Sequence, residues 1–360
     1  MSSSRRVAIV GCGGMAHHHA QDYVLMPETD LVAVCDIDAE RAASFAKEFE
    51  IEAVYTDVGE MIDSSNPEIV AVATRPIDHA KPTIEALKRG VHVLCEKSLA
   101  PTLVECDSMI KAAEDNRVIL AVNTQRRTEP YHRHAKMLLE HGLVGDIRAI
   151  HGYSKSYPAA YNLQNIGSHL FDSMRLLMGD VEWVHAHLTH NKEEIAPKHV
   201  ERDILGTGVG AGTDIQMSMW FSSGADGTAE MYDGFGAFGW EVVGLKGSLA
   251  LRGTQTELMY CADPGWYTGN GDEGAWESLP VPCGTREKEA LARRRYPVEL
   301  MMLDVLDAID TGRPPASSGE HGRAAVEIIA AAYQSQLTSA RMTLPMTERH
   351  HPLDKWLPAE

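Results

Sequence analysis

The stretch Val7-Ala8-Ile9-Val10-Gly11-Cys12-Gly13-Gly14-Met15-Ala16 decides the fold of this chain. It matches the pattern G-x-G-x-x-[GA] directly after an apolar run and directly before a helical pattern. Gly11 permits a tight turn, Gly13 lets backbone N–H groups approach a pyrophosphate, and Ala16 is small enough for a helix to pack on a strand. The helix N-terminus adds partial positive charge for the phosphates. The stretch predicts a dinucleotide-binding loop made by Gly11, Gly13, Gly14, Met15 and Ala16.

Asp36 supports this interpretation because it ends the second apolar run, Val32-Ala33-Val34-Cys35-Asp36, and follows Ala16 by 20 residues. At that spacing a carboxylate accepts hydrogen bonds from the adenosine ribose hydroxyls and repels a 2′-phosphate. We therefore expect NAD as the cofactor and consider NADP less favoured. The alternative role for Asp36 is to cap a helix over Asp38–Ala46.

The first third of the chain alternates short strand patterns with amphipathic helical patterns. Because these strands are apolar throughout, they predict a doubly wound parallel sheet covered on both faces. The expected strands are Arg6–Val10, Leu31–Cys35, Ile69–Thr74, His92–Cys95 and Val118–Val122, and the expected helices are Ala39–Glu48, His79–Arg89 and Leu103–Asp115.

The pattern changes after about residue 125. A helix over Tyr131–His141, a strand from Ile147 to Ser156 and a helix over Leu163–Met178 precede a series of Gly-interrupted strand patterns between Val181 and Tyr260. Asp263–Gly284 is expected to be a loop, and helices return at Tyr296–Asp310 and Gly322–Thr338. Consecutive strands without helices between them predict a large, open, mostly antiparallel sheet. We expect a Rossmann domain over residues 1–125 and an α/β substrate and oligomerisation domain over residues 126–360.

Composition narrows the choice of partners. The 360 residues carry a formal net charge of −18, which disfavours nucleic acid and anionic membrane surfaces as partners. No run of 18 apolar residues predicts a membrane span. The six cysteines show no disulfide-scaffold spacing, and three lie in or beside predicted strands. These features are typical of a cytoplasmic enzyme.

Two further segments carry candidate chemistry. Lys97, in Cys95-Glu96-Lys97, follows a parallel strand, and ligands bind at the carboxyl ends of such strands. Taken alone, Lys97 is better explained as a surface lysine that starts a loop. Asn165, His169 and Asp172 would form one stripe of the helix predicted over Leu163–Met178. Asp172 could instead only pair with Arg175 or Lys155, and His169 could be a packed helix residue.

These segments together resemble the glucose–fructose oxidoreductase/inositol dehydrogenase (Gfo/Idh/MocA) family, almost from end to end. The resemblance is carried by Gly11–Ala16 with His19, Cys35–Asp38, Ala73–Pro76 with His79, Gly90–Lys97, Gln125–Arg127 with Pro130, Gly142–Asp146, Gly167–His169 with Asp172 and Gly179, Gly244–Leu249, and Ile309–Pro314.

The resemblance implies an enzyme that oxidises a secondary alcohol of a sugar or cyclitol with NAD(P). It places Glu96 and Lys97 at the nicotinamide, and Thr74, Arg75 and His79 beside the cofactor. It makes His169 the proton acceptor, with Lys97 holding the reacting oxygen, although these two roles could be exchanged. It also implies a homodimer or homotetramer. Tyr157, Tyr161, Asn165, Asp172 and Arg127 are the candidates for binding sugar hydroxyls.

The chain departs from the family pattern at several of these positions. Asn165 stands where many family dehydrogenases have an Asp, Ser98 follows Glu96-Lys97 where Pro is common, and Arg75 replaces the Pro expected after Thr74. The loop before the histidine helix is shortened to Tyr157–Gln164. These departures bear on substrate identity and on catalytic detail.

Two rival functions remain. Some relatives oxidise a glycoside transiently with tightly held NAD, eliminate the aglycone and re-reduce the product. A non-catalytic dinucleotide-sensing regulator is less favoured because both Lys97 and His169 are present. A metal site on His185 and His187 is not expected, since no matching ligands follow at a recognised spacing.

Overall fold

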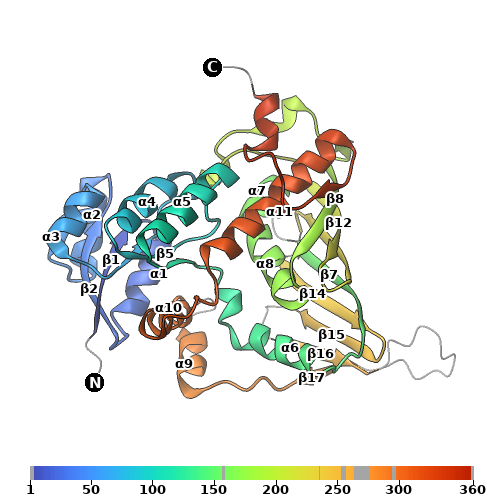
Figure 1. Cartoon of the computed structure of the whole chain (residues 1–360), viewed down its shortest axis with the longest axis horizontal. Helices are drawn as coiled ribbons and strands as arrows, with labels where there is room; N and C mark the ends of the chain where they lie inside the picture. Colours follow the sequence, from blue (N-terminus) through green and yellow to red (C-terminus); the bar gives the residue numbers. More distant parts are fainter. Residues whose placement is uncertain are drawn as a thin grey trace. The chain divides into compact units, whose positions relative to one another are not determined.

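The computed structural model describes residues 4–155, 159–234, 236–252, 257–262, 276–293 and 297–357. The chain divides into two compact units (Figure 1). The first unit is Met1–Thr128 with Gly284–Arg323, and the second is Glu129–Cys283 with Ala324–Glu360. The expected division at residue 125 does not include the return of Gly284–Arg323 to the first unit, and it stays a prediction.

The first unit is built on a six-stranded parallel sheet with the order β3-β2-β1-β4-β5-β6. Its strands are β1 (Arg5–Val10), β2 (Thr29–Cys35), β3 (Ala53–Tyr55), β4 (Ile69–Val72), β5 (His92–Cys95) and β6 (Leu120–Val122). The strand order reverses beside β1, which is the switch point where open α/β sheets bind ligands. The predicted doubly wound sheet is confirmed.

Helices connect these strands, and side-chain caps fix where three of them begin. They are α1 (Gly14–Tyr23), α2 (Ala39–Glu48), α3 (Val58–Ser65), α4 (Ala80–Lys88) and α5 (Leu103–Asn116), with short 3₁₀ turns η1 (Pro76–Asp78) and η2 (Gln125–Arg127). Asp38, Asp57 and Thr102 accept backbone N–H bonds at the starts of α2, α3 and α5. Such caps satisfy N–H groups that have no partner inside the helix.

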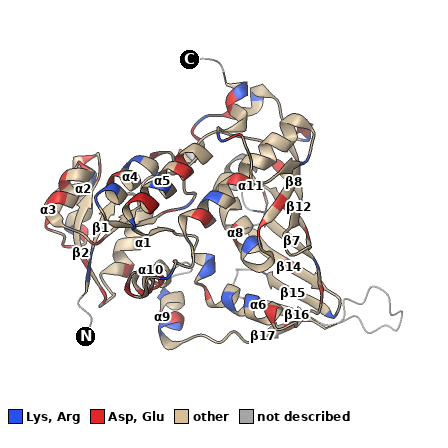
Figure 2. Cartoon of the chain, in the orientation of Figure 1, with Lys and Arg blue, Asp and Glu red and all other residues tan. Residues whose placement is uncertain are grey.

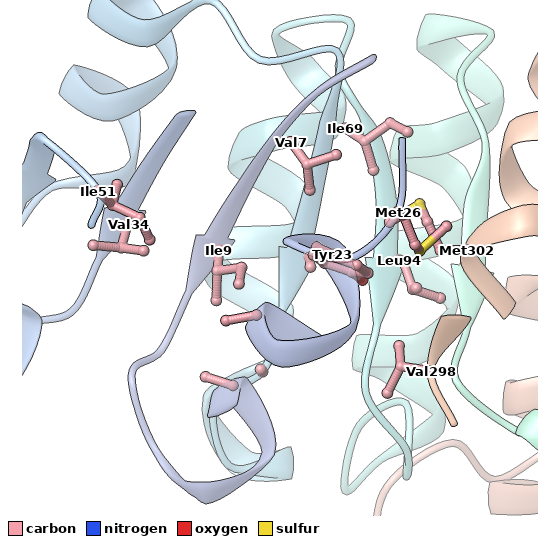
Figure 3. Packing of buried hydrophobic residues seen from close by; sticks show 14 of the residues in the cluster. Val7, Ile9, Tyr23, Met26, Val34, Ile51, Ile69, Leu94, Val298 and Met302 are labelled. Atoms are coloured by element: carbon pink, nitrogen blue, oxygen red, sulfur yellow. The ribbon is translucent and has the colours of Figure 1, made fainter. Parts of the chain in front are cut away.

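The core of the first unit packs β1, β2, β4 and β5 against α1 and the C-terminal segment (Figure 3). That segment includes α9 (Thr285–Arg293), α10 (Glu299–Thr311) and the start of α11 (Gly319–Thr338). Val298 and Met302 lie in the same buried cluster as Tyr23, Val7 and Leu94. Residues from the last fifth of the chain therefore complete the core around α1.

The second unit contains a large mixed sheet with the order β17-β16-β15-β14-β7-β13-β12-β8-β18, in which β9 also pairs with β8. Only β7 and β13 pair in parallel, so the predicted open, mostly antiparallel sheet is confirmed. The strands are β7 (Ile147–Lys155), β8 (Val181–His190), β9 (Glu193–Glu194), β12 (Asp214–Phe221), β13 (Asp226–Tyr232), β14 (Ala237–Gly244), β15 (Gly247–Arg252), β16 (Glu257–Cys261), β17 (Glu277–Leu279) and β18 (Met342–Thr343).

Helices cover one face of this sheet. They are α6 (Pro130–Glu140), α7 (Ala159–Asn165), α8 (Gly167–Met178) and most of α11. The unit also contains a small two-stranded sheet of β10 (Val200–Glu201) and β11 (Gly210–Ala211), and the 3₁₀ turns η3 (Pro197–His199), η4 (Ile204–Gly206) and η5 (Pro352–Trp356). Along β8, Val184 and Ala186 are buried whereas His185 and His187 are exposed. The alternation leaves a polar outer face.

The helix predicted over Leu163–Met178 is two helices, which corrects the expected stripe. α7 ends at Asn165 and α8 begins at Gly167. The hydroxyl of Ser168 donates to the Asn165 carbonyl at 2.8 Å, and the His169 N–H donates to Ile166 instead of Asn165. A serine that bonds nearby backbone offers an alternative to the helical ladder. Asn165 therefore does not share a helix with His169 and Asp172.

Several other elements differ from the sequence prediction. β3, α3 and α9 were not predicted; they have three, eight and nine residues. Of the loop expected over Asp263–Gly284, residues 263–275 lie outside the described part of the chain, and the remainder contains β17. Acidic and basic residues are interspersed along the helices of both units (Figure 2).

Candidate active site

The glycine loop between β1 and α1 has the geometry that its sequence predicts. Gly11 has φ +88°, and a Cβ there would lie 2.8 Å from the backbone nitrogen of Thr74. Only glycine fits such a position without displacing backbone. A Cβ at Gly13 or Gly14 would meet nothing within 4 Å, and Ala16 is fully buried. The start of α1 thus faces open space, as a phosphate site requires.

Asp36 lies at the end of β2 with its carboxylate beside this loop. One oxygen accepts from Cys12 N–H at 2.8 Å and the other from Asp38 N–H at 2.9 Å. The suggestion that Asp36 caps the following helix is wrong, because Asp38 is the N-cap of α2. The guanidinium of Arg41 lies 3.7 Å from the Asp36 carboxylate. Each carboxylate oxygen can still accept a ribose hydroxyl.

The segment after β4 carries Thr74, Arg75 and His79, and these three residues differ in exposure. Thr74 is half-buried, and the exposed Arg75 pairs with Asp78 at 2.9 Å. His79 is fully buried: Nδ1 lies 3.0 Å from the Ser98 carbonyl and Nε2 lies 3.1 Å from the Thr74 carbonyl. Burial lowers the pKa of its imidazole. His79 thus joins the segment after β4 to the segment after β5 and offers no surface for contact with a cofactor.

Glu96 is the centre of a buried polar cluster at the carboxyl end of β5. One oxygen accepts from His19 Nε2 at 2.7 Å and from Asn123 Nδ2 at 2.6 Å, and the other accepts from Lys97 N–H at 3.2 Å. Burial alone would raise the pKa of Glu96, but hydrogen bonds and positive charge lower it to about 2. Glu96 is therefore an ionised carboxylate held inside the protein.

Lys97 follows directly, and its peptide bond to Ser98 is cis. Its side chain is half-buried. Burial lowers the pKa of the ammonium, Glu96 opposes that change, and Arg126 lowers the pKa further. Arg126 lies in η2, after the strand next to β5, and is itself buried. The charges of Glu96 and Arg126 thus act on the pKa of Lys97 in opposite directions, and such perturbed groups cluster at functional sites.

The second unit carries the remaining candidates. His169 lies in the first turn of α8 and is 6% exposed, while Asp172 has no exposed surface. Asn165 Nδ2 donates to the Tyr161 hydroxyl at 2.8 Å, and both side chains are half-buried. Arg127 is half-buried in η2 of the first unit. Tyr157 lies outside the described residues.

Comparison with known proteins identifies the family. The model for the Gfo/Idh/MocA oxidoreductase family with an NAD-binding Rossmann fold matches residues 5–124, and the model for its C-terminal alpha/beta domain matches residues 136–344. The chain belongs to the Gfo/Idh/MocA oxidoreductase family. The resemblance inferred from the sequence is confirmed.

Individual relatives of this Gfo/Idh/MocA member are distant. D-apiose dehydrogenase of Paraburkholderia graminis is 27% identical over 55% of this chain and 56% of its own length. Myo-inositol 2-dehydrogenase of Thermotoga maritima is 24% identical over 92% of this chain and 96% of its own. A levoglucosan dehydrogenase structure, in complex with NADH and levoglucosan, has a TM-score of 0.78, 23% identity and coverage of 95% of this chain and 100% of that one.

Sequence reasoning missed two residues of the buried cluster beside the Gfo/Idh/MocA lysine: Tyr23, which contacts His19, and Asn123, which donates to Glu96. His19 and Arg126 entered only as parts of the family motifs. The signals were present, because His19 and Tyr23 are four residues apart on a predicted helix and Asn123 directly follows a predicted strand. What sequence could not give is that His19 and Asn123 meet on one carboxylate.

Neither a metal site nor a membrane-spanning helix is found among the residues that the structure describes. Within the ranges given above, no group of three or more His, Cys, Asp or Glu side chains could hold a metal ion. Among the same residues, no helix combines the length and the apolar run that crossing a bilayer requires.

Proposed function

We propose that this protein transfers a hydride between a secondary alcohol of a sugar or cyclitol and NAD. The observation that carries the proposal is Lys97, held beside buried, ionised Glu96 at the carboxyl end of β5 in an NAD-binding Rossmann unit. The relatives support the substrate class, since their names specify D-apiose, myo-inositol and levoglucosan. All three compounds are polyhydroxylated.

The residues of the first unit fit a dinucleotide. Open space at Gly13 and Gly14 allows a pyrophosphate to approach the start of α1, with Met15 exposed beside it. Asp36 would accept the ribose hydroxyls and repel a 2′-phosphate, which supports NAD over NADP. Thr74 and Arg75 would border the cofactor. His79 and Glu96 would act through the segments they hold, because both are buried.

When NAD is bound, its nicotinamide ring would accept the hydride. We assign the uptake of the hydroxyl proton to His169, whose imidazole is suited to proton transfer near neutral pH. Lys97 would hydrogen-bond the reacting oxygen and stabilise developing negative charge. The lowered pKa of Lys97 also allows the exchanged assignment, in which the lysine takes the proton.

Substrate hydroxyls would be bound by Arg127, Tyr161 and Asn165, with Tyr157 as a further candidate. The Asn165 amide donates to the Tyr161 hydroxyl at 2.8 Å, so these two side chains are held together as one polar pair. Asp172 is fully buried and fits a supporting role better than direct contact. A site that pairs several hydroxyls discriminates strongly, because an analogue lacking one leaves a buried group unpaired.

We also propose that two copies associate through the outer face of the large sheet. This face carries both basic and acidic side chains: Lys155 pairs with Glu230 at 3.0 Å, and Arg252 pairs with Glu241 at 3.2 Å. A two-fold interface brings the same patch together twice, so it requires such self-complementarity.

A substrate panel tests the proposed activity. Purified protein with NAD is offered sugars, glycosides and cyclitols, and NADH absorbance is followed with the free sugar measured in parallel. Multiple turnovers of NADH on a polyol are expected. Glycoside cleavage without released NADH would establish the oxidation–elimination–re-reduction cycle instead. NAD binding without turnover on any compound, in either direction, would favour the regulator.

A further inference from the structure

The imidazole of His17 links the start of α1 to the end of α2. Its Nδ1 lies 2.9 Å from the carbonyl oxygen of Gly13, the N-cap of α1. Its Nε2 lies 3.3 Å from a carboxylate oxygen of Glu48, the last residue of α2. The ring packs edge-on against Phe45 and Phe49, with centroid distances of 4.8 and 5.7 Å. The ring is therefore held against the end of α2 while one of its nitrogens reaches the glycine loop.

The hydrogen bond between His17 and Gly13 has one possible direction. A carbonyl oxygen only accepts, so Nδ1 donates and carries a proton. The bond is the same whether Nε2 is protonated or not. The Gly13 carbonyl also accepts the backbone N–H of His17 at 3.3 Å, which is long for a hydrogen bond of this kind. The shorter of its two hydrogen bonds therefore comes from the side chain.

The Gly13 carbonyl and the Gly14 N–H belong to one peptide group. In a planar trans peptide the C=O and the N–H point in opposite directions, so a bond that fixes the carbonyl also fixes the direction of the N–H. Glycine has the widest backbone freedom of any residue, so this peptide is held least by its own residues. A Cβ at either glycine would meet nothing within 4 Å. The imidazole of His17 is thus an anchor for a peptide that faces open space.

We infer that His17 is a positioning residue for the dinucleotide phosphates: its Nδ1–H holds the Gly13–Gly14 peptide so that the Gly14 N–H faces the pyrophosphate. His17 acts through the peptide that it holds and not by contact with the cofactor. The inference rests on the proposed binding of NAD. It involves neither Lys97 nor the second unit.

The same contacts would also serve a side chain that only packs α1 against α2. The two roles use different parts of His17. Nδ1 serves the glycine loop, whereas the ring edge and Nε2 serve the contacts with Phe45, Phe49 and Glu48. Substitutions can therefore keep one part and remove the other.

His17→Asn keeps the donor and removes the ring, because the amide nitrogen of Asn is as many bonds from the backbone as Nδ1 of His. The chain already contains this geometry: Asn116 Nδ2 donates to the carbonyl of Ala112, four residues earlier, at 2.8 Å. His17→Phe does the opposite. It keeps a ring against Phe45 and Phe49 and has no donor.

Calorimetric titration with ADP-ribose compares the two variants, since this probe carries the pyrophosphate but no nicotinamide. His17→Phe should bind ADP-ribose about fivefold more weakly than the wild type, the scale of one lost hydrogen bond. His17→Asn should bind it as the wild type does, even if loss of the ring lowers the melting temperature. If His17→Phe binds like the wild type, or if His17→Asn is the weaker of the two, the ring only packs the helices and the inference is wrong.

Adenosine separates the phosphates from the rest of the cofactor site. It keeps the ribose hydroxyls proposed for Asp36 but has no phosphate. Ligand-detected NMR should therefore give the same adenosine affinity for the wild type and for His17→Phe. Equal weakening of adenosine and ADP-ribose would show that the substitution displaces α2, and it would overturn the inference.

His141 provides a matched control in the second unit. Its Nδ1 lies 2.7 Å from the carbonyl of Met137, four residues earlier, so His141→Phe removes the same kind of bond. This variant should keep the wild-type affinity for ADP-ribose, and a loss equal to that of His17→Phe would contradict the inference. A wild-type protein that binds no ADP-ribose would refute the proposed NAD binding and the inference together. If the protein binds ADP-ribose but turns over no sugar, only the proposed activity fails, and the affinities still decide the role of His17.

Discussion

The carboxylate of Asp36 and the guanidinium of Arg41 lie 3.7 Å apart at the end of β2, and this pair bears on the choice of cofactor. Asp36→Ser removes the charge that would repel a 2′-phosphate, and it leaves Arg41 available to pair with one. We expect NAD affinity to fall about tenfold, or about 1.4 kcal/mol, and NADP affinity to rise by a similar factor. Tryptophan fluorescence titration with each cofactor measures both.

The control for this prediction is Asp36→Ser/Arg41→Ala. It should bind both cofactors weakly and without the gain in NADP affinity, because Arg41, the cation beside Asp36, has been removed. Asp36→Ser that still binds NAD more tightly than NADP would contradict the role assigned to Asp36.

His169 is the second residue whose role can be separated from folding. His169→Ala should lower turnover by about 10²- to 10⁴-fold, the usual contribution of a proton acceptor. NAD affinity should stay unchanged, because His169 belongs to the second unit and the glycine loop to the first. Cofactor titration, turnover and thermal melting are measured on the same preparation.

Because His169 is buried, the alanine variant can also leave a cavity that lowers the melting temperature. His169→Gln fills more of that space and is the matched second variant. Inactive His169→Gln with normal melting and normal NAD affinity supports the assignment. Retained turnover would remove His169 from proton transfer and leave Lys97 in that role.

At the scale of elements, the turn between β1 and α1 contains two glycines that we expect to be required for different reasons: Gly11 for folding and Gly13 for cofactor binding. Gly11→Ala places a Cβ 2.8 Å from Thr74 N at φ +88°, so the protein should lose about 1–3 kcal/mol of stability. Gly13→Ala meets nothing within 4 Å and has an allowed backbone, so its melting temperature should be normal. Its NAD affinity should still fall at least tenfold, because the Cβ occupies the space of the pyrophosphate.

Thermal melting and NAD titration of the two variants check this contrast. Normal NAD affinity in Gly13→Ala would show that the cofactor does not approach the loop there. Normal melting in Gly11→Ala would show that the contact with Thr74 can relax.

The buried strands of the first sheet could be predicted from sequence, and its shortest, partly exposed strand could not. β1, β2, β4 and β5 are runs of buried residues, and the parallel sheet follows from them. β3 has three residues of mixed exposure, so no periodicity marks it. At the break between α7 and α8 the Ser168 hydroxyl donates to the Asn165 carbonyl, a local contact that no apolar pattern marks.

The candidate site, too, could be predicted only where its residues are close together in the sequence. The glycine loop and Asp36 are local in sequence, and their spacing was enough to place them. The cluster on Glu96 joins residues 77 and 27 positions away, His19 and Asn123. Such contacts depend on which strands become neighbours, and strand order is a property of the whole sheet.

At the scale of the whole molecule, the outer face of the large sheet determines the expected assembly. Ser218 lies midway along β12 on this face, between His185 of β8 and Thr228 of β13, and all three are exposed. We expect light scattering to give about 79 kDa or a higher multiple of the chain mass of 39.5 kDa. Ser218→Arg adds a long cation that meets its own copy across a two-fold axis, so the mass should fall to that of one chain. Glu114 is an exposed residue of α5 in the first unit, so Glu114→Arg introduces the same side chain away from this sheet face and should leave the mass unchanged. A wild-type mass near 40 kDa, or loss of assembly in Glu114→Arg alone, would show that this sheet face is not the interface.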